Sequence, residues 1–534
     1  MPIQPSSLAV AVGAGVQNAV FTPAANDIPR NIVVIGTFNP SLSPTAEVPR
    51  QISSPAEAGV LYGQGYMLAR LLKAVFSGLG AGGATVWAIP QAEAGGAAAA
   101  TSNTFAITGP ASAAGTLAFY VSAIRYAISV SSGMTATQIG DALVAAMAAD
   151  PDCPCTGINT TGTVALTSKS KGPWGNSIPV AVNIQPGDAM PSGVSVTVTA
   201  LSGGTGVPTI ANALAALGTG SGANTLPNGQ GMTDLVHGYL ASDTTMPATA
   251  QDQTTVTAIS TYNGLANADP PTGCYDHLVG KPFRCILGDA TNSASLPSAL
   301  TAFTGANIYD RTSAILCVAG SRTHPCEIAA IATGVISVRA GATAHRPYMG
   351  MVLPGVEAGP SGMWTADYAN RDAAVKAGLS PTIVQGGAVV LQNIVTMYAG
   401  NTGVPVTSNG YREWVNLCKL QNIIASMLST FRSAKWQGIT IVSDTAAVTD
   451  PVAKQYVRSI SDVIDELIAL AKAWEGKGWI YTSSFTIAAL KAGGAVTVRT
   501  GGDGFVAVLP GILSGVGNII DTTFRFDISL AGVA

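Results

Sequence analysis

Charge is scarce in this chain. Asp, Glu, Lys and Arg make up 10% of its 534 residues, against about 25% in an ordinary soluble protein. The formal net charge of −3 leaves no basic surplus for binding nucleic acid or an anionic membrane. A free monomer with so few charges would be poorly solvated. We therefore expect much of the surface to be buried against partners.

Long unbroken apolar runs are also missing, although hydrophobic residues reach 47% and the mean hydropathy is +0.36. The longest uncharged run, residues 189–233, is rich in Gly, Ser and Thr and contains prolines, so it cannot form a spanning helix. The first residues lack the positive charge and apolar stretch of a signal peptide. These features predict a protein that is made in a cytoplasm and has no membrane partner.

Catalytic motifs are absent as well. The four histidines, His237, His277, His324 and His345, form no HExxH motif, no serine occupies a G-x-S-x-G elbow, and no lysine a Walker A loop. We expect no catalytic residue, cofactor or metal site, and no enzyme activity. A β-rich carbohydrate-active enzyme would need two carboxylates about 5–10 Å apart in a cleft, whereas the acidic residues here lie mostly at helix starts and turns.

One glycine motif does match a nucleotide fingerprint. Residues 78–83 read G-x-G-x-x-G, but they follow a predicted helix and precede a predicted strand. That order is the reverse of the dinucleotide-binding one, so no helix N-terminus would face a phosphate. We interpret the motif as a flexible helix-to-strand turn.

The seven cysteines fall into two groups. Three lie in apolar runs and are interpreted as core thiols: Cys285, Cys317 and Cys418. Four lie near Pro, Gly and Asp in expected loops, and are therefore expected to be exposed: Cys153, Cys155, Cys274 and Cys326. Cys274, His277, His324 and Cys326 could supply four zinc ligands, but their spacing in the sequence is irregular and zinc needs four ligands that converge. We favour disulfides from the loop cysteines to neighbouring subunits, formed after the particle leaves a reducing cytoplasm.

Changes in composition and residue pattern along the chain divide it into six parts. These are an N-terminal arm (1–30), the N-terminal part of the core (31–92), a β-rich inserted domain (93–205), an α/β middle domain (206–370), a C-terminal domain (371–520) and a C-terminal β-arm (521–534). The inserted part shows many short Thr/Val/Ile/Ser runs and one helix, 135–149. The middle part alternates strands at 235–240, 283–288, 314–319 and 348–353 with helices at 247–265, 295–304 and 325–338.

The predicted fold class is therefore a multidomain α/β protein. Its core is a mainly parallel, helix-covered mixed sheet, to which a β-rich inserted domain and extended N- and C-terminal β-arms are added. Long helices follow at 411–431 and, after the N-cap pair Asp450-Pro451, at 452–474. The second helix carries a polar stripe of Lys454, Arg458, Asp462 and Asp465.

Several colinear segments resemble the tail sheath proteins of Mu-like contractile phages. In the first, residues 53–92, a glycine-marked helix leads to a strand that reads Trp87-x-Ile89-Pro90. The others are 114–150, 172–183, 394–403, the helix from Tyr411, the helix from Val452 and the strand Phe524–Leu530. Residues 206–280 and the number of cysteines depart from the family.

The resemblance implies a contractile sheath. In that family, hexameric rings stack helically around an inner tube, and contraction triggered at the baseplate drives the tube through a bacterial envelope without nucleotide hydrolysis. The expected partners are the chain itself, the inner tail tube protein, and the baseplate and tail terminator proteins, with no nucleic acid. The expected location is the virion tail, after assembly in the host bacterial cytoplasm.

The resemblance also implies roles for particular segments. Sheath arms add strands to the sheets of neighbouring subunits, and the candidates here are Leu8, Val10 and Val12 together with Phe524, Arg525, Phe526, Ile528 and Leu530. In the last strand the apolar residues alternate with Arg525, Asp527 and Ser529, as expected for a half-buried strand. The tube-facing candidates are Lys454, Arg458, Asp462 and Asp465. The alternative to a sheath is another self-assembling subunit, of a surface array or a tube.

Overall fold

The computed structural model describes residues 27–241, 251–264, 271–292, 312–398, 410–500, 502 and 504–515. The chain divides into two compact units, with the boundary after Ala425. The larger contains the described residues from Asp27 to Ala425, and the smaller contains those from Ser426 to Ser514. The six-part division predicted from the sequence stays a prediction.

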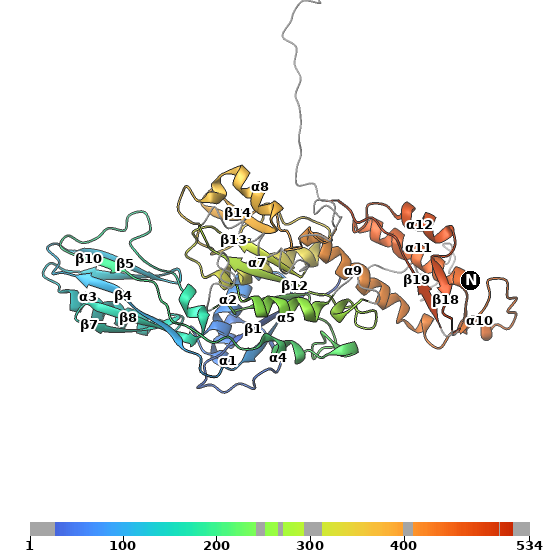
Figure 1. The fold of residues 1–534 in the computed structure, drawn as a ribbon, viewed down its shortest axis with the longest axis horizontal. Coiled ribbons are helices and arrows are strands. Elements are labelled where there is room, and N and C mark those ends of the chain that lie inside the picture. The colour runs from blue at the N-terminus through green and yellow to red at the C-terminus, as the bar shows by residue number, and fades with distance from the viewer. Residues whose placement is uncertain are drawn as a thin grey trace, which may run out of the picture. The chain divides into compact units, whose positions relative to one another are not determined.

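The core of the larger unit is an eight-stranded sheet (Figure 1). Six strands run parallel in the order β14-β13-β12-β11-β1-β3, and β15 and β2 pair antiparallel at the two edges. Their bounds are Asn31–Thr37 (β1), Arg50–Ile52 (β2), Thr85–Gln91 (β3), Asp234–His237 (β11), Arg284–Asp289 (β12), Ser313–Cys317 (β13), Leu379–Gln385 (β14) and Ala388–Leu391 (β15). The parallel strands are continuous buried runs, as expected for a sheet covered on both faces. The predicted mainly parallel sheet is confirmed.

The predicted strand at 348–353 is wrong. This segment forms an isolated bridge, between Val352 and Val390 of β15, with three backbone hydrogen bonds to β15 around it, but it is not a regular strand. The sheet is continued instead by β14, which pairs in parallel with β13. Apolar character alone did not separate this segment from a strand, because apolar residues also occur in loops beside a sheet edge, where Tyr348 and Leu353 are buried while Met349 and Val352 are exposed.

Helices cover the sheet, with α2 and α7 packed on β1, β11 and β12 (Figure 1). The helices of the larger unit are α1 (Pro55–Tyr62), α2 (Met67–Leu79), α4 (Ile210–Ala215), α5 (Gln253–Asn263), α7 (Pro325–Ala342) and α8 (Tyr368–Lys376). Short 3-10 turns lie at Pro173–Ser177 (η1), Gly220–Gly222 (η2), Gly273–Tyr275 (η3) and Trp364–Ala366 (η4). The helix predicted at 295–304 lies outside the described residues. Within the described part of the chain, no helix is long and apolar enough to span a bilayer.

The glycine motif at 78–83 begins in the last turn of α2 and leads towards β3, so the predicted order of helix, turn and strand is confirmed. Gly80 has φ 54° and ends the helix. Gly78 has a second role, because a Cβ there would lie 2.1 Å from the carbonyl oxygen of Ile331 in α7. On the facing helix, a Cβ on Gly334 would lie 2.5 Å from the carbonyl oxygen of Val75. The two glycines therefore permit a close approach of the α2 and α7 backbones.

Residues 93–205 contain two small antiparallel sheets and one helix. The first sheet has the order β10-β4-β8-β7 and the second β6-β5-β9. Their strands are Ala99–Thr108 (β4), Gly115–Val121 (β5), Ile124–Val130 (β6), Cys155–Thr160 (β7), Thr163–Lys171 (β8), Val180–Val182 (β9) and Ser195–Val198 (β10), and α3 spans Ala136–Ala149. Phe105 and Phe119 pack edge to face between the sheets, with ring centroids 5.0 Å apart. The predicted short strands with one helix among them are confirmed.

The smaller unit is mostly helical. The helix α9 (Trp414–Phe431) begins in the larger unit, and the smaller unit then contains η6 (Ala434–Trp436), β16 (Thr440–Ile441), α10 (Ala453–Tyr456), β17 (Val457–Arg458), α11 (Ile460–Gly476), α12 (Ser483–Lys491), β18 (Val496–Val498) and β19 (Phe505–Ala507). Along α11, Val463, Leu467, Leu470 and Trp474 are buried at helical spacing. Trp474 Nε1 donates to Ser426 Oγ at 2.8 Å, which ties α11 to the C-terminal part of α9.

The single helix predicted from 452 to 474 is interrupted after its first turn, which is α10. Val457 and Arg458 are extended and pair in parallel with β16. A new helix then starts at Ser459, whose hydroxyl and Asp462 form a reciprocal capping box. The side chain of Ser459 thus ends the extended segment, and α10 is left as a single turn.

Candidate functional site

The described residues form no group of three or more His, Cys, Asp or Glu side chains that could hold a metal ion. The alternative zinc set of Cys274, His277, His324 and Cys326 is therefore not assembled. Cys274 Sγ donates to the backbone oxygen of Tyr262, and His324 is occupied in a different part of the larger unit. The irregular spacing of these four residues in the sequence therefore matches their lack of a common site in the fold.

The expected exposure of the four loop cysteines is wrong. Cys153, Cys155, Cys274 and Cys326 are all buried, with at most 3% of each residue exposed, and all are free thiols. Burial raises the pKa of Cys274 to about 12, and it raises that of Cys155 and Cys326 as well. Turn residues next to a cysteine show that the backbone bends there, but not which way the thiol points. The disulfide between subunits stays a prediction, and it would require these thiols to become exposed.

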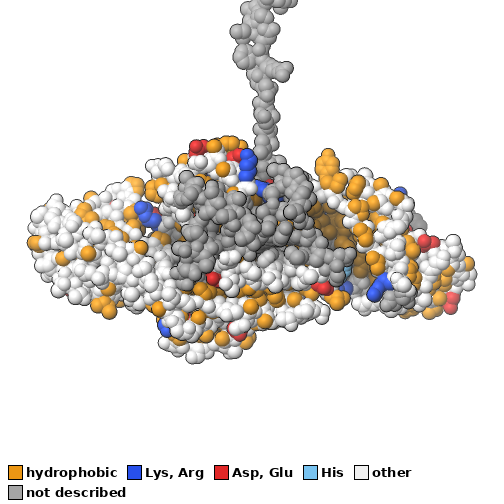
Figure 2. Space-filling model, viewed as in Figure 1, with side chains coloured by type: hydrophobic (Ala, Val, Ile, Leu, Met, Phe, Trp, Pro, Cys, Tyr) orange, Lys and Arg blue, Asp and Glu red, His pale blue; other side chains and the backbone are white. Residues whose placement is uncertain are grey.

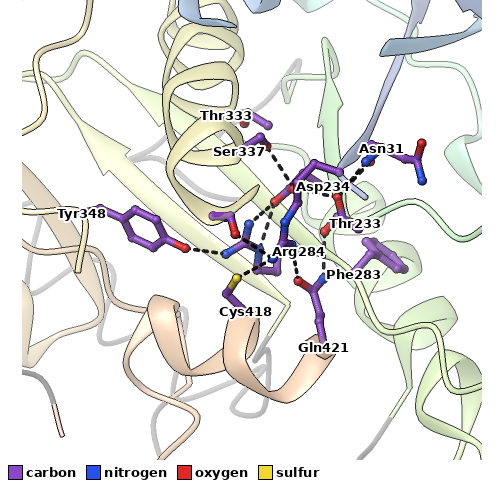
Figure 3. Close-up of polar contacts among 12 residues, drawn as sticks. Asn31, Thr233, Asp234, Phe283, Arg284, Thr333, Ser337, Tyr348, Cys418 and Gln421 are labelled. Carbon is purple, nitrogen blue, oxygen red and sulfur yellow. Dashed lines mark hydrogen bonds and ion pairs between the residues drawn. The ribbon is translucent and has the colours of Figure 1, made fainter. Parts of the chain in front are cut away.

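The main buried polar cluster surrounds Arg284 (Figure 3). Its side chain is completely buried, and Nε and Nη2 both donate to one oxygen of Asp234, at 2.9 and 2.6 Å. Nη1 donates to the hydroxyl of Tyr348 at 3.0 Å, and the guanidinium lies 5.5 Å from the ring centroid of Trp414. Burial alone would lower the pKa of Arg284, but the combined effect of Asp234, Tyr348 and Cys418 outweighs it and the pKa is raised.

The partners of this ion pair come from several elements. The second oxygen of Asp234 accepts hydrogen bonds from Ser337 of α7 and from Thr233. Close by, Arg30 donates to Gln421 Oε1 at 2.8 Å, and Gln421 Nε2 donates to the backbone oxygens of Thr233 and Pro282. The cluster therefore fixes the first turns of α9 on the N-terminal ends of β1, β11 and β12. Its geometry serves positioning, because its acid and base are already paired with each other.

A second polar cluster joins α2 and α7, the helices on the central sheet, to residues 93–205. Arg70 of α2 donates to Glu327 of α7 at 2.6 Å, to the backbone oxygen of Asp152 at 2.7 Å and to Ser122 Oγ at 2.9 Å. Ser170 of β8 accepts from the backbone N–H of Met67, the first residue of α2. These bonds attach the small sheets to the start of two core helices.

His324 and Trp174 belong to the same junction. The rings stack with centroids 3.7 Å apart, and His324 Nε2 lies 3.1 Å from the carbonyl oxygen of Trp174. His324 Nδ1 accepts from the backbone N–H of Cys326, so the side chain caps α7. Burial lowers the pKa of His324 to about 4. In the sequence, the only signal was a helix start with Pro325 in its first turn and Glu327 close behind.

The four tube-facing candidates do not share one helix face. Lys454 lies in α10, Arg458 in β17, and Asp462 and Asp465 in α11. Arg458 donates to the backbone oxygens of Val457 and Lys435 and lies over the ring of Trp436. The Asp462 carboxylate accepts from the backbone N–H of Ser459. The stripe expected from helical spacing is therefore wrong, while contact of these residues with a tube stays a prediction.

An exposed apolar ribbon lies in the smaller unit. The strands β18 and β19 form an antiparallel two-stranded sheet. Val498, Val506 and Val508 on or beside it are 38%, 47% and 70% exposed. The predicted arm residues Leu8, Val10, Val12, Phe524, Arg525, Phe526, Ile528 and Leu530 lie outside the described residues.

No protein-family model matches the chain. Among solved structures, similar chains are sheath tail proteins from Listeria innocua (12% identity, TM-score 0.44, 93% of this chain and 94% of that one) and Desulfitobacterium hafniense (12%, 0.42, 95% and 100%). The PVC sheath of an extracellular contractile injection system, in its contracted state, is 8% identical with a TM-score of 0.47, over 98% of this chain and 99% of that one.

One curated relative gives a match in sequence. It is the Mu-like prophage FluMu tail sheath protein of Haemophilus influenzae, 32% identical over 189 residues, which are 35% of this chain and 38% of that protein. The chain thus spans less than half the length of the relative it matches. The resemblance predicted from the motifs is confirmed, and over those residues the chain is a homologue of a Mu-like prophage tail sheath protein.

Proposed function

We propose that this chain is the structural subunit of the contractile tail sheath of a phage or phage-tail-like particle. The observation that carries the proposal is the 32% identity to a Mu-like prophage tail sheath protein. In this role the chain polymerises with itself as stacked hexameric rings around an inner tube protein, between a baseplate and a tail terminator. Contraction then drives the tube through a bacterial envelope.

The chemistry of the described residues suits a protein that is not an enzyme. The charges around Arg284 and Arg70 are paired inside the fold, where they hold helices and sheets in position. No energy source besides the assembly itself is needed, because a metastable extended polymer can release free energy when it contracts. The protein would reside in the virion tail after assembly in the bacterial cytoplasm.

The ribbon of β18 and β19 is the acceptor that we propose for an arm of a second copy. A two-stranded sheet alone is marginally stable in water, and this one leaves apolar side chains exposed. An added strand would pair with a free edge through its backbone and cover these side chains. Phe524, Phe526, Ile528 and Leu530 alternate with polar residues in the sequence, which is the pattern that such a strand needs. The segment containing Leu8, Val10 and Val12 is the second candidate arm.

Negative-stain electron microscopy of the purified protein tests the proposal. We expect hollow, ridged tubes of uniform wide bore, because sheath subunits that polymerise by themselves should adopt the contracted form. Small monodisperse particles at every concentration tried would contradict the assembly role. Parallel grids with reducing agent test the disulfide prediction, which requires tube formation to change on reduction.

A further inference from the structure

One face of the sheet β10-β4-β8-β7 is built mostly from small hydroxyl side chains. Across three strands, Thr101, Thr167 and Thr156 lie opposite one another, and the hydroxyls of Thr101 and Thr167 are 3.1 Å apart. We call this surface the hydroxyl face and define it by Thr101, Ala106, Thr108, Thr156, Ile158, Thr160, Thr163, Ala165, Thr167, Ser195 and Thr197. Register places these residues on one side of the sheet.

The opposite side of this sheet is packed. Phe105, Val164 and Leu166 alternate with the hydroxyl residues along β4 and β8 and are completely buried. On that side the sheet contacts α3, and Phe105 meets Phe119 of the second sheet. The hydroxyl face is therefore the solvent side of a one-sided antiparallel sheet. On the edge strand β7, Ile158 is 71% exposed, which leaves a large aliphatic side chain in water.

None of the residues that define the hydroxyl face is charged, although Lys169 and Lys171 follow Thr167 on the same side of β8. Residues 93–205 contain eight charged side chains, and each contacts a residue outside the hydroxyl face. Four form pairs within the segment, Glu93 with Lys171 and Arg125 with Asp188. The other four contact Lys73, Tyr126, Asn159 and the backbone of Pro151: Asp152, Asp150, Asp141 and Lys169 respectively. Figure 2 shows the surface over β4, β7, β8 and β10 as largely white, with little blue or red.

This composition selects the kind of partner. A face without charge gives no counterion to nucleic acid, to an anionic lipid or to a strongly charged protein. Hydroxyl groups both donate and accept hydrogen bonds, so they fit a second surface of the same neutral chemistry. Two copies of this segment would meet without like-charge repulsion, and Thr and Ser would lose little side-chain entropy.

We propose that the hydroxyl face is a contact surface that becomes buried against a second copy of this chain. The proposal rests on the proposed assembly function and goes beyond it, because it assigns a subunit contact to residues 93–205, far from the arms in the sequence. Burial of Ile158 supplies an apolar contribution, and the threonines supply uncharged hydrogen bonds. Such a contact depends little on salt.

Thiol labelling of two single-cysteine additions tests the contact. All seven native cysteines are buried, so a maleimide reacts selectively with a new surface thiol. The variant Ile158→Cys reports on the hydroxyl face, and Ser129→Cys, on an exposed position of β6 in the other sheet, is the matched control. Labelling rates are measured for dispersed subunits and for polymers verified by electron microscopy.

We expect the labelling rate of Ile158→Cys to fall at least tenfold on assembly, while that of Ser129→Cys changes little. Equal labelling of Ile158→Cys in both states would overturn the proposal and leave the face to a partner outside the polymer. Equal protection of both positions would also overturn it, because the protection would then come from general occlusion. If no polymer forms, the proposed function fails, and this inference fails with it.

A pair of charge insertions gives an independent measurement. Ile158→Lys places a charge on the edge strand of the hydroxyl face, and Ser129→Lys places the same charge on the control sheet. We expect Ile158→Lys to raise the protein concentration needed for polymerisation at least tenfold more than Ser129→Lys does. Circular dichroism of the dispersed subunits verifies folding. If the two variants need the same protein concentration for polymerisation, the proposed contact is contradicted.

Discussion

The imidazole of His324 lies almost flat on the indole of Trp174, with 3.7 Å between ring centroids and 28° between the ring planes. Trp174 comes from η1 in the small-sheet segment, while His324 begins α7 on the central sheet. Nδ1 accepts from the backbone N–H of Cys326, so the proton is on Nε2, where it can be donated to the carbonyl oxygen of Trp174. Only the neutral ring satisfies both bonds.

This arrangement predicts an acid-sensitive junction. Burial lowers the pKa of His324 from 6.5 to about 4, so between these values the unfolded chain binds a proton that the folded chain excludes. Stability from this group is complete above pH 6.5 and declines as the pH falls towards 4. The variant His324→Asn lacks this group, so the difference in free energy of unfolding between wild type and variant should shrink by about 1.4 kcal/mol for each pH unit below 6.5.

Urea unfolding of both proteins at pH 7 and pH 4.5 measures this difference. The wild type is compared with the variant because other groups titrate in the same pH range. Burial lowers the pKa of His237 to about 4 and raises that of Asp289 to about 6, and these effects have opposite signs and are common to both proteins. If the difference in free energy of unfolding between wild type and variant is the same at both pH values, His324 does not make the junction sensitive to pH.

The glycine contact between α2 and α7 predicts a steep cost for one added methyl group. Gly78→Ala places a Cβ against the backbone carbonyl of Ile331, so the helices must separate, and we expect a loss of about 2 kcal/mol or more. Gly83→Ala lies in the same motif with no atom within 4 Å of its Cβ, and should stay within about 0.5 kcal/mol of wild type. Thermal unfolding measures both, and equal effects would contradict the close approach.

The buried pair of Arg284 and Asp234 predicts strong coupling. Arg284→Met or Asp234→Asn alone leaves an uncompensated charge in the core, and each should cost about 3–5 kcal/mol. The double variant should be considerably more stable than the sum of the two losses implies. Lys376→Met, which breaks the exposed pair with Asp372, should change stability by less than about 1 kcal/mol. Additive losses in a double-mutant cycle would count against the pair.

The arm proposal predicts different effects for neighbouring residues of the last strand. If Phe526 lies on the buried side of an added strand, Phe526→Asp should weaken assembly more than Arg525→Asp does. Deletion of residues 521–534 should leave a folded subunit that does not assemble. Sedimentation and electron microscopy measure both, and normal-length tubes from the deletion variant would refute the arm role.

Much of the local structure was predictable because it depends on residues close together in the chain. The buried run 31–36, the helix start at Ser54 and the alternation across 93–205 each carry their own signal of pattern or cap. The order of strands and helices similarly indicated a parallel, covered sheet. The low charge was also readable, and it led to the assembly hypothesis without any structural information.

Other predictions failed because neighbours in space decide them. The break at 457–459 depends on pairing with β16, and the burial of Cys153 and Cys274 depends on segments that pack over their turns. Nothing local distinguishes a cysteine turned inward from one turned outward.

Residue patterns in the chain were enough to predict the type of most elements, the scarcity of charge and the resemblance to sheath proteins. Only the tertiary structure paired Arg284 with Asp234, stacked His324 on Trp174 and aligned Thr101, Thr167 and Thr156 in one row. The physical reason is one of range. Periodicity and capping act over a few residues, whereas these three arrangements join positions between 11 and 150 residues apart.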